Sequence, residues 1–230
     1  MMPVDNSRLI QAEACEGWTA VEVNSPTVSV ARLAVPGNAR SEFRKACGEL
    51  KIDRFQDAES HARRAVQMYP DYAAAWVVLG QALESEHKDA EAVQACNRAM
   101  KADPTYAPPY ICLAQLAEGS NQWDDVYELS DRARALDPVA DPYAYYYAGV
   151  ADLHLKQLTQ AELDARNALT LDPRNEIPEI HLLLADIYQA RGNKTGQAFE
   201  LEKFLEIAPH DSQWQAARAT LAAIQSDPPK

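Results

Sequence analysis

The chain has 230 residues, of which 47% are apolar and 24% are charged, with only 8 Gly and 14 Pro. This composition is that of an ordinary globular protein and argues against a disordered or fibrous one. The formal net charge is −12 and no run of basic residues occurs, so we expect no nucleic-acid partner, because phosphate binding needs clustered Lys and Arg.

The sequence as given contains no segment typical of a membrane or export signal. No stretch of 18 apolar residues occurs, so we expect no membrane insertion. The first residues lack a basic region followed by an apolar run, so we expect no signal peptide. These observations predict a cytoplasmic protein, or an exported one if the start is incomplete.

Residues 1–37 differ in character from the rest of the chain. Segments 18–23 and 27–35 are rich in Val and Thr, and Asn24-Ser25-Pro26 between them is a turn signal. We interpret this N-terminal extension as two short strands or an extended arm. Because an isolated hairpin is marginal in water, it must pack on the remainder or belong to a larger domain.

From residue 38 onward the sequence repeats itself. Five prolines are separated by 34, 34, 35 and 36 residues: Pro70, Pro104, Pro138, Pro173 and Pro209. A small residue stands 24 positions before each of them: Ala46, Gly80, Ala114, Gly149 and Ala185. A fixed period in this range predicts a stacked-repeat architecture.

The unit 73–106 shows the pattern most completely. It reads Trp76-x-x-Leu79-Gly80-x-x-Leu83, then Ala92-x-x-x-Cys96, then Ala99 and Pro104. This unit resembles the tetratricopeptide repeat, although Leu83 replaces the usual Tyr and Cys96 the usual Phe. The resemblance implies an all-α, right-handed superhelical solenoid of helix-turn-helix repeats.

The period divides the chain into five repeats within 38–209, followed by one more helix. The repeats are 39–72, 73–106, 107–141, 142–177 and 178–210, and we expect two helices in each. The expected helices are 39–52, 55–68, 73–86, 89–102, 107–119, 123–136, 142–155, 158–171, 178–191 and 194–207. Segment 211–225 carries an apolar stripe and is predicted to be a capping helix, with 226–230 as a tail.

The sequence offers no catalytic, metal or cofactor site. It contains no Gly-rich phosphate loop, no H-E-x-x-H and no G-x-S-x-G. The five histidines are scattered along the chain, and the four cysteines show no C-x-x-C spacing, so neither a zinc site nor a redox motif is indicated. Cys96 and Cys112 fall at positions expected to be buried, and we interpret them as small core residues.

The function that remains is recognition, and the resemblance implies where it would occur. In the tetratricopeptide family the first helix of each repeat lines a concave groove. The positions that tend to face it are here Val77, Gln81, Glu84, Ile111, Gln115, Glu118, Tyr143, Tyr146, Val150, His154, Asp186 and Gln189. Tyr146 is the strongest of these candidates, because tyrosine gives a large contact area and keeps a polar tip.

These observations predict a non-enzymatic scaffold that binds a peptide or protein segment in the groove. The Lys, Asn and Arg set with which some family members hold a carboxylate is absent. One alternative is an accessory segment of a larger exported or envelope protein. The other is an enzyme with a small-molecule site in the groove.

Overall fold

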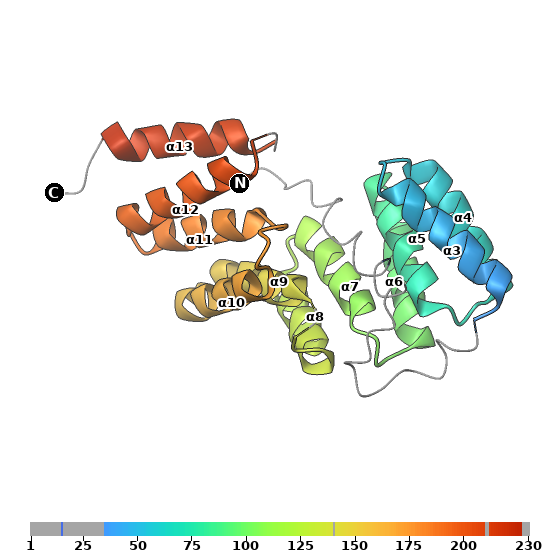
Figure 1. The fold of residues 1–230 in the computed structure, drawn as a ribbon. Helices are drawn as coiled ribbons and strands as arrows, with labels where there is room; N and C mark the ends of the chain where they lie inside the picture. The colour runs from blue at the N-terminus through green and yellow to red at the C-terminus, as the bar shows by residue number, and fades with distance from the viewer. Residues whose placement is uncertain (1–14, 16–34, 140, 210–211, 227–230) are drawn as a thin grey trace.

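The computed structural model describes Cys15 and residues 35–139, 141–209 and 212–226. This part of the chain is all-helical and contains no strand, which confirms the predicted fold class (Figure 1). The strands proposed for the N-terminal extension lie outside the described residues.

Ten of the helices form five antiparallel pairs, one pair for each repeat, and we call the two members helix A and helix B. Their bounds differ from the expected ones by no more than two residues. The pairs are α3 Gly37–Leu50 with α4 Phe55–Met68, α5 Ala73–Ser85 with α6 Asp89–Ala102, α7 Pro108–Gly119 with α8 Trp123–Leu136, α9 Pro142–His154 with α10 Leu158–Leu171, and α11 Glu179–Ala190 with α12 Lys194–Ile207.

The recurring prolines end each helix B at the same place. Every helix B stops two residues before its proline, and the residue between them has left the helical conformation, as Asp103 shows with φ −144° and ψ 94°. Proline disfavours helical geometry in the residue before it, so it forces this exit. The chain then turns back into the next helix A.

The link from helix A to helix B is a left-handed turn that also recurs with the repeat. In these links the residues with positive φ are Asp53, His87, Asn121, Lys156 and Gly192, at the same 34 to 36 residue spacing as the prolines. In the second repeat the His87 amide donates to Glu84 O and the Lys88 amide to Leu83 O. This pair of bonds is the Schellman motif, which satisfies carbonyl groups at the end of a helix.

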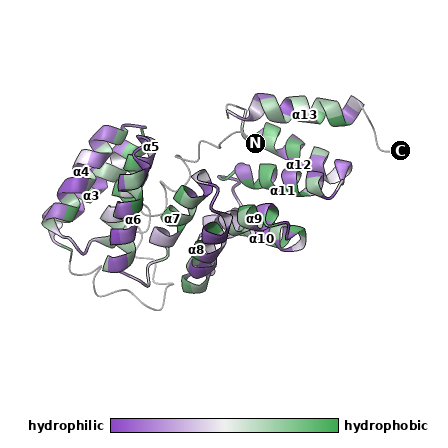
Figure 2. Ribbon diagram, turned by 180° about the vertical axis from the view of Figure 1, so that it is seen from behind, coloured by the Kyte–Doolittle hydropathy of each residue, from purple (hydrophilic) through white to green (hydrophobic). Residues whose placement is uncertain are grey.

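Helices A form the inner layer of the solenoid. Helix α5 buries ten of its 13 residues, whereas α6 buries four of its 14. Figure 2 shows hydrophilic and hydrophobic residues mixed within individual helices, as expected for elements that pack on one face. An aromatic residue near the start of helix A is held by a hydrogen bond to the carbonyl group of the preceding proline in three repeats. Trp76 Nε1 donates to Pro70 O at 2.7 Å, and the hydroxyl groups of Tyr110 and Tyr145 donate to Pro104 O and Pro138 O.

The last helix, α13 Trp214–Ser226, lies along α12 at the end of the stack (Figure 1). Its Ala217 is buried in a small cluster with Ala185, Leu201 and Phe204, and Leu221 and Ile224 pack against that cluster. The apolar stripe read from the sequence therefore faces the fifth repeat.

Candidate binding groove

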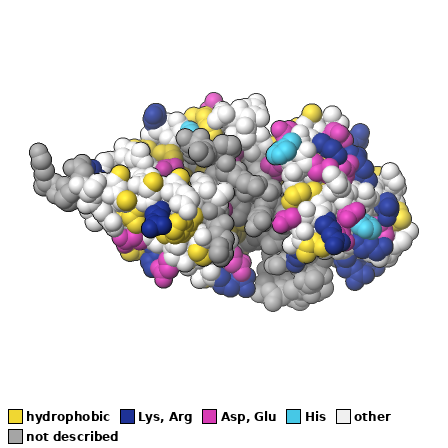
Figure 3. All heavy atoms as spheres, turned by 90° about the horizontal axis from the view of Figure 1, so that it is seen from above, with side chains coloured by type: hydrophobic (Ala, Val, Ile, Leu, Met, Phe, Trp, Pro, Cys, Tyr) yellow, Lys and Arg dark blue, Asp and Glu magenta, His cyan; other side chains and the backbone are white. Residues whose placement is uncertain are grey.

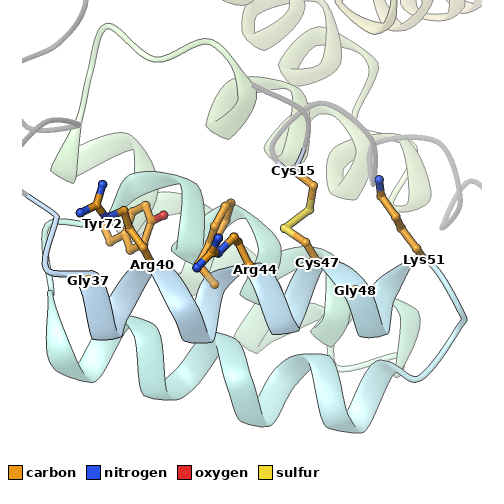
Figure 4. A pocket seen from close by; sticks show the side chains of 9 residues that line it. Cys15, Gly37, Arg40, Arg44, Cys47, Gly48, Lys51 and Tyr72 are labelled. Atoms are coloured by element: carbon orange, nitrogen blue, oxygen red, sulfur yellow. A yellow bond between two sulfur atoms is a disulfide. The ribbon is translucent and has the colours of Figure 1, made fainter. Parts of the chain in front are cut away.

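The first helix A carries a hollow lined by basic and aromatic side chains. It has a volume of about 520 Å³, and Arg40, Phe43, Arg44, Lys51 and Tyr72 line it with Cys15, Gly37, Cys47 and Gly48. Figure 4 shows Arg40, Arg44, Cys47 and Lys51 rising from one face of α3. Burial raises the pKa of the Tyr72 phenol. The positive charges of Arg40 and Arg44 act in the opposite direction and lower that pKa, but burial has the larger effect.

Because the sequence repeats, the other helices A have residues at positions equivalent to those on this face of α3. Cys47 is followed at the spacing of 34, 34, 35 and 36 residues by equivalent positions in the other helices A. We call this set the groove row: Cys47, Gln81, Gln115, Val150 and Asp186. Although Gln81 and Gln115 are polar, each is only 4% exposed, whereas Asp186 at the far end is exposed.

A second set of predicted groove residues lies at the positions equivalent to Phe43. Val77 and Ile111 are fully buried, and Tyr146 is 3% exposed. The Tyr146 ring packs edge-on against Tyr147 at 5.2 Å between centroids, and the neighbouring Tyr143 is also buried. These aromatic residues therefore belong to the packed layer of helices A, and their role in binding stays a prediction.

The remaining predicted residues lie towards the ends of their helices. Glu84 and Glu118 are half-buried. His154 stacks on Trp123 of α8 with 3.6 Å between the ring centroids, and burial, helped by Lys156, lowers its pKa. Gln189 is exposed and accepts a hydrogen bond from Gln197 Nε2 at 3.0 Å. His154 and Gln189 thus have partners in neighbouring helices B.

The cysteines depart from the interpretation drawn from their spacing. Cys96 and Cys112 are buried, as expected, but they form a disulfide that joins α6 to α7 and thus the second repeat to the third. Cys15 forms a second disulfide with Cys47. Sequence reasoning missed both because a bond between distant residues leaves no local motif such as C-x-x-C.

A pair of buried carboxyl groups lies between the third and fourth repeats. Asp164 accepts hydrogen bonds from Arg134 at 2.7 Å and Gln160 at 3.0 Å. Burial and the neighbouring Asp164 raise the pKa of Asp152 to about 7. This pair joins α8, α9 and α10 and is enclosed by them.

Among the described residues, no group of three or more His, Cys, Asp or Glu side chains could hold a metal ion. No helix within the same residues is long and apolar enough to cross a membrane.

One feature of the hollow was not anticipated from the sequence. The first repeat contains seven Lys and Arg against six Asp and Glu, although the whole chain has a net charge of −12. Figure 3 shows charged side chains gathered over the α3–α6 end of the molecule. Counting charge repeat by repeat would have revealed this local basic character.

Comparison with known proteins agrees with the architecture. Residues 43–107 match the family model described as tetratricopeptide repeat. No curated protein sequence matches the chain significantly. This match, the repeated helix pairs and the solved structures below show that the chain has the tetratricopeptide repeat fold. Proteins built from such repeats generally act as scaffolds for protein partners.

The solved structures share the fold at low sequence identity. TTC0263, a thermophilic protein of Thermus thermophilus, is 19% identical with a TM-score of 0.66, over 80% of this chain and 99% of that one. PilF of Pseudomonas aeruginosa is 18% identical with a TM-score of 0.68, over 83% and 85%. A chain of the APC/C Cut9–Hcn1 hetero-tetramer is 19% identical with a TM-score of 0.75, and the match covers 85% of this chain but 39% of that one.

Proposed function

We propose that the chain is a non-enzymatic scaffold that binds an extended peptide or protein segment along its helices A. The observation that carries the proposal is the groove row. It places two glutamine amides, Gln81 and Gln115, at equivalent positions of adjacent repeats, next to the apolar Val77 and Ile111.

This combination suits a peptide chain. An extended peptide presents N–H and C=O groups at regular intervals, and a glutamine amide can both donate to and accept from them. The net charge of −12 disfavours nucleic acid.

A random peptide library displayed on phage tests the proposal with the full chain as bait. Peptides that enrich should bind the wild-type chain and lose about tenfold or more in affinity to the Gln115→Ala variant, as expected for a central contact. Asn97→Ala on α6 is the matched control, because it removes a half-buried amide from a helix B, away from the groove row, and should leave affinity unchanged. Circular dichroism checks that both variants stay helical.

Two results would contradict the proposal. The first is a library that yields no peptide. The second is a set of peptides whose affinity falls with Asn97→Ala and not with Gln115→Ala.

The disulfides favour the further proposal that the protein works in an oxidising compartment, as an exported or envelope protein. Structural disulfides persist in such compartments and are rare in the cytosol. The test is a thiol titration of the chain purified from its source without reductant and then denatured. All four cysteines should be unreactive. Four reactive thiols would mean that the protein is cytosolic and reduced.

A further inference from the structure

The Cys15–Cys47 disulfide connects the N-terminal extension to the groove row. The two Cα atoms lie 5.7 Å apart, and Cys47 is the first member of that row. Cys15 lines the basic hollow on α3 (Figure 4). Whatever path residues 1–14 take, they start from the first helix A on the face that the row occupies.

We propose that residues 1–14 of this chain are themselves the ligand of the groove row, held in place by the Cys15–Cys47 disulfide. The inference rests on the proposed function of the groove and names its resident occupant. An external partner then competes with this segment for the same positions.

The length of the segment fits the row. Fourteen extended residues reach about 46 Å at about 3.3 Å each. Packed helices lie about 8–10 Å apart, so the four helices A beyond α3 require about 40 Å. The segment is therefore long enough to pass all of them.

The chemistry of the row also fits. Gln81 and Gln115 are almost fully buried, and a glutamine amide can both donate hydrogen bonds to and accept them from a peptide backbone. A peptide backbone lying across them supplies both donors and acceptors. Residues 1–14 include Met2, Val4, Leu9 and Ile10, which suit the apolar positions beside the row.

Charge is complementary at the tethered end. Glu13 and Glu16 flank Cys15 in the sequence, and Arg40, Arg44 and Lys51 line the hollow where Cys15 is bound. The tether also favours this segment over a second copy of the chain, because a short link raises its effective concentration to about the millimolar range.

Photo-crosslinking within the full chain tests the proposal. Benzoylphenylalanine is introduced in place of Leu9, the dilute protein is irradiated, and its tryptic peptides are identified by mass spectrometry. We expect crosslinks within one molecule to α5 or α7. The same photoreactive residue in place of Ala222, which is exposed on α13, is the control and should not reach those helices.

The tether is tested with the variants Cys15→Ser and Cys47→Ser in the same photoreactive background. Each should reduce the crosslink yield about fivefold or more, because the effective concentration of the segment falls, while circular dichroism is unchanged. Yields equal to those of the parent would show that the disulfide does not hold the segment.

The other outcomes of crosslinking overturn the proposal. Links only to helices B, or no links, would place the segment elsewhere, and links between two molecules would make the occupant a second copy. Because no external peptide is present, these results are independent of the library experiment. Peptide binding to the groove without these crosslinks would leave the proposed function standing and refute only the resident ligand.

Discussion

At the residue scale, Gly80 marks a close approach of α5 to α6 of the same repeat and to α7 of the next. A Cβ at this position would lie 2.3 Å from Cys96 Sγ and 3.1 Å from Cys112 Sγ. Gly80→Ala should therefore lower the free energy of unfolding by about 1–3 kcal/mol through overpacking. Gly48→Ala on exposed α3 backbone meets nothing within 4 Å and should raise it by about 0.5–1 kcal/mol. Urea unfolding of both variants measures the difference, and equal midpoints would contradict it.

Asp152 predicts a pH dependence of stability, because its pKa of about 7 lies above that of an unfolded Asp, about 3.9. A carboxyl group with a raised pKa supports the fold while protonated, and that support is lost as the pH rises through the folded value. The urea midpoint should therefore fall from about pH 5 to about pH 8 and become less pH-dependent in Asp152→Asn. Asp124→Asn, at an exposed site on α8, is the control and should keep the wild-type slope. A slope in Asp152→Asn as steep as in wild type would refute the assignment.

At the element scale, the left-handed turns between helices A and B differ in their conformational free energy. Four of the five are made by residues with a Cβ, such as Lys156 with φ 65°, whereas Gly192 occupies the fifth. A Cβ in this conformation costs about 1–2 kcal/mol. Lys156→Gly should therefore stabilise the protein by up to about 1 kcal/mol and Gly192→Ala should destabilise it by a similar amount. The thermal unfolding midpoints of the two variants measure these effects. Midpoints that shift in the same direction for both variants would contradict the prediction.

The helix α13 predicts a different kind of effect. Deleting residues 211–230 uncovers Leu201 and Phe204, which pack against Ala217 of that helix. An exposed apolar patch at the end of a solenoid promotes association. The truncated chain should form dimers or larger species in light scattering and bind a hydrophobic dye more strongly. A monomer with unchanged melting would mean that α13 does not cap the stack.

The elements that could be predicted are those encoded in every repeat. Proline and the small residues recur because each repeat must end a helix and allow a close helix crossing. The pattern can be recognised because it occurs in five repeats, even where single repeats depart from it. The left-handed turns were not predicted, since Asp53, His87, Asn121 and Lys156 share a conformation but no residue type. The burial of Tyr146 and Gln115 was not foreseen either, because family positions define a face and not what covers it.

At the scale of the whole molecule, the interior divides into two large clusters that meet between the second and third repeats. One cluster runs from the first repeat to Cys112, Leu113 and Leu116 of α7, and the other runs from α7 to α11. Because repeats contact only their neighbours, cooperative unfolding of the two halves depends on the packing at this junction. The Cys96–Cys112 disulfide crosses it.

The double variant Cys96→Ala/Cys112→Ala should therefore affect both stability and cooperativity. Losing a bridge that closes a loop of 16 residues should lower the free energy of unfolding by about 2–4 kcal/mol. The two halves should also separate in urea, so that the fluorescence of Trp76 and of Trp123 changes at different midpoints, each followed in a variant whose other tryptophans are Phe. A dithiol reductant is the control, because it should bring the wild type close to the variant and change the variant less. If the oxidised wild type and the variant unfold at one common midpoint, the disulfide does not couple the halves, and the packing of α6 on α7 alone carries the cooperation.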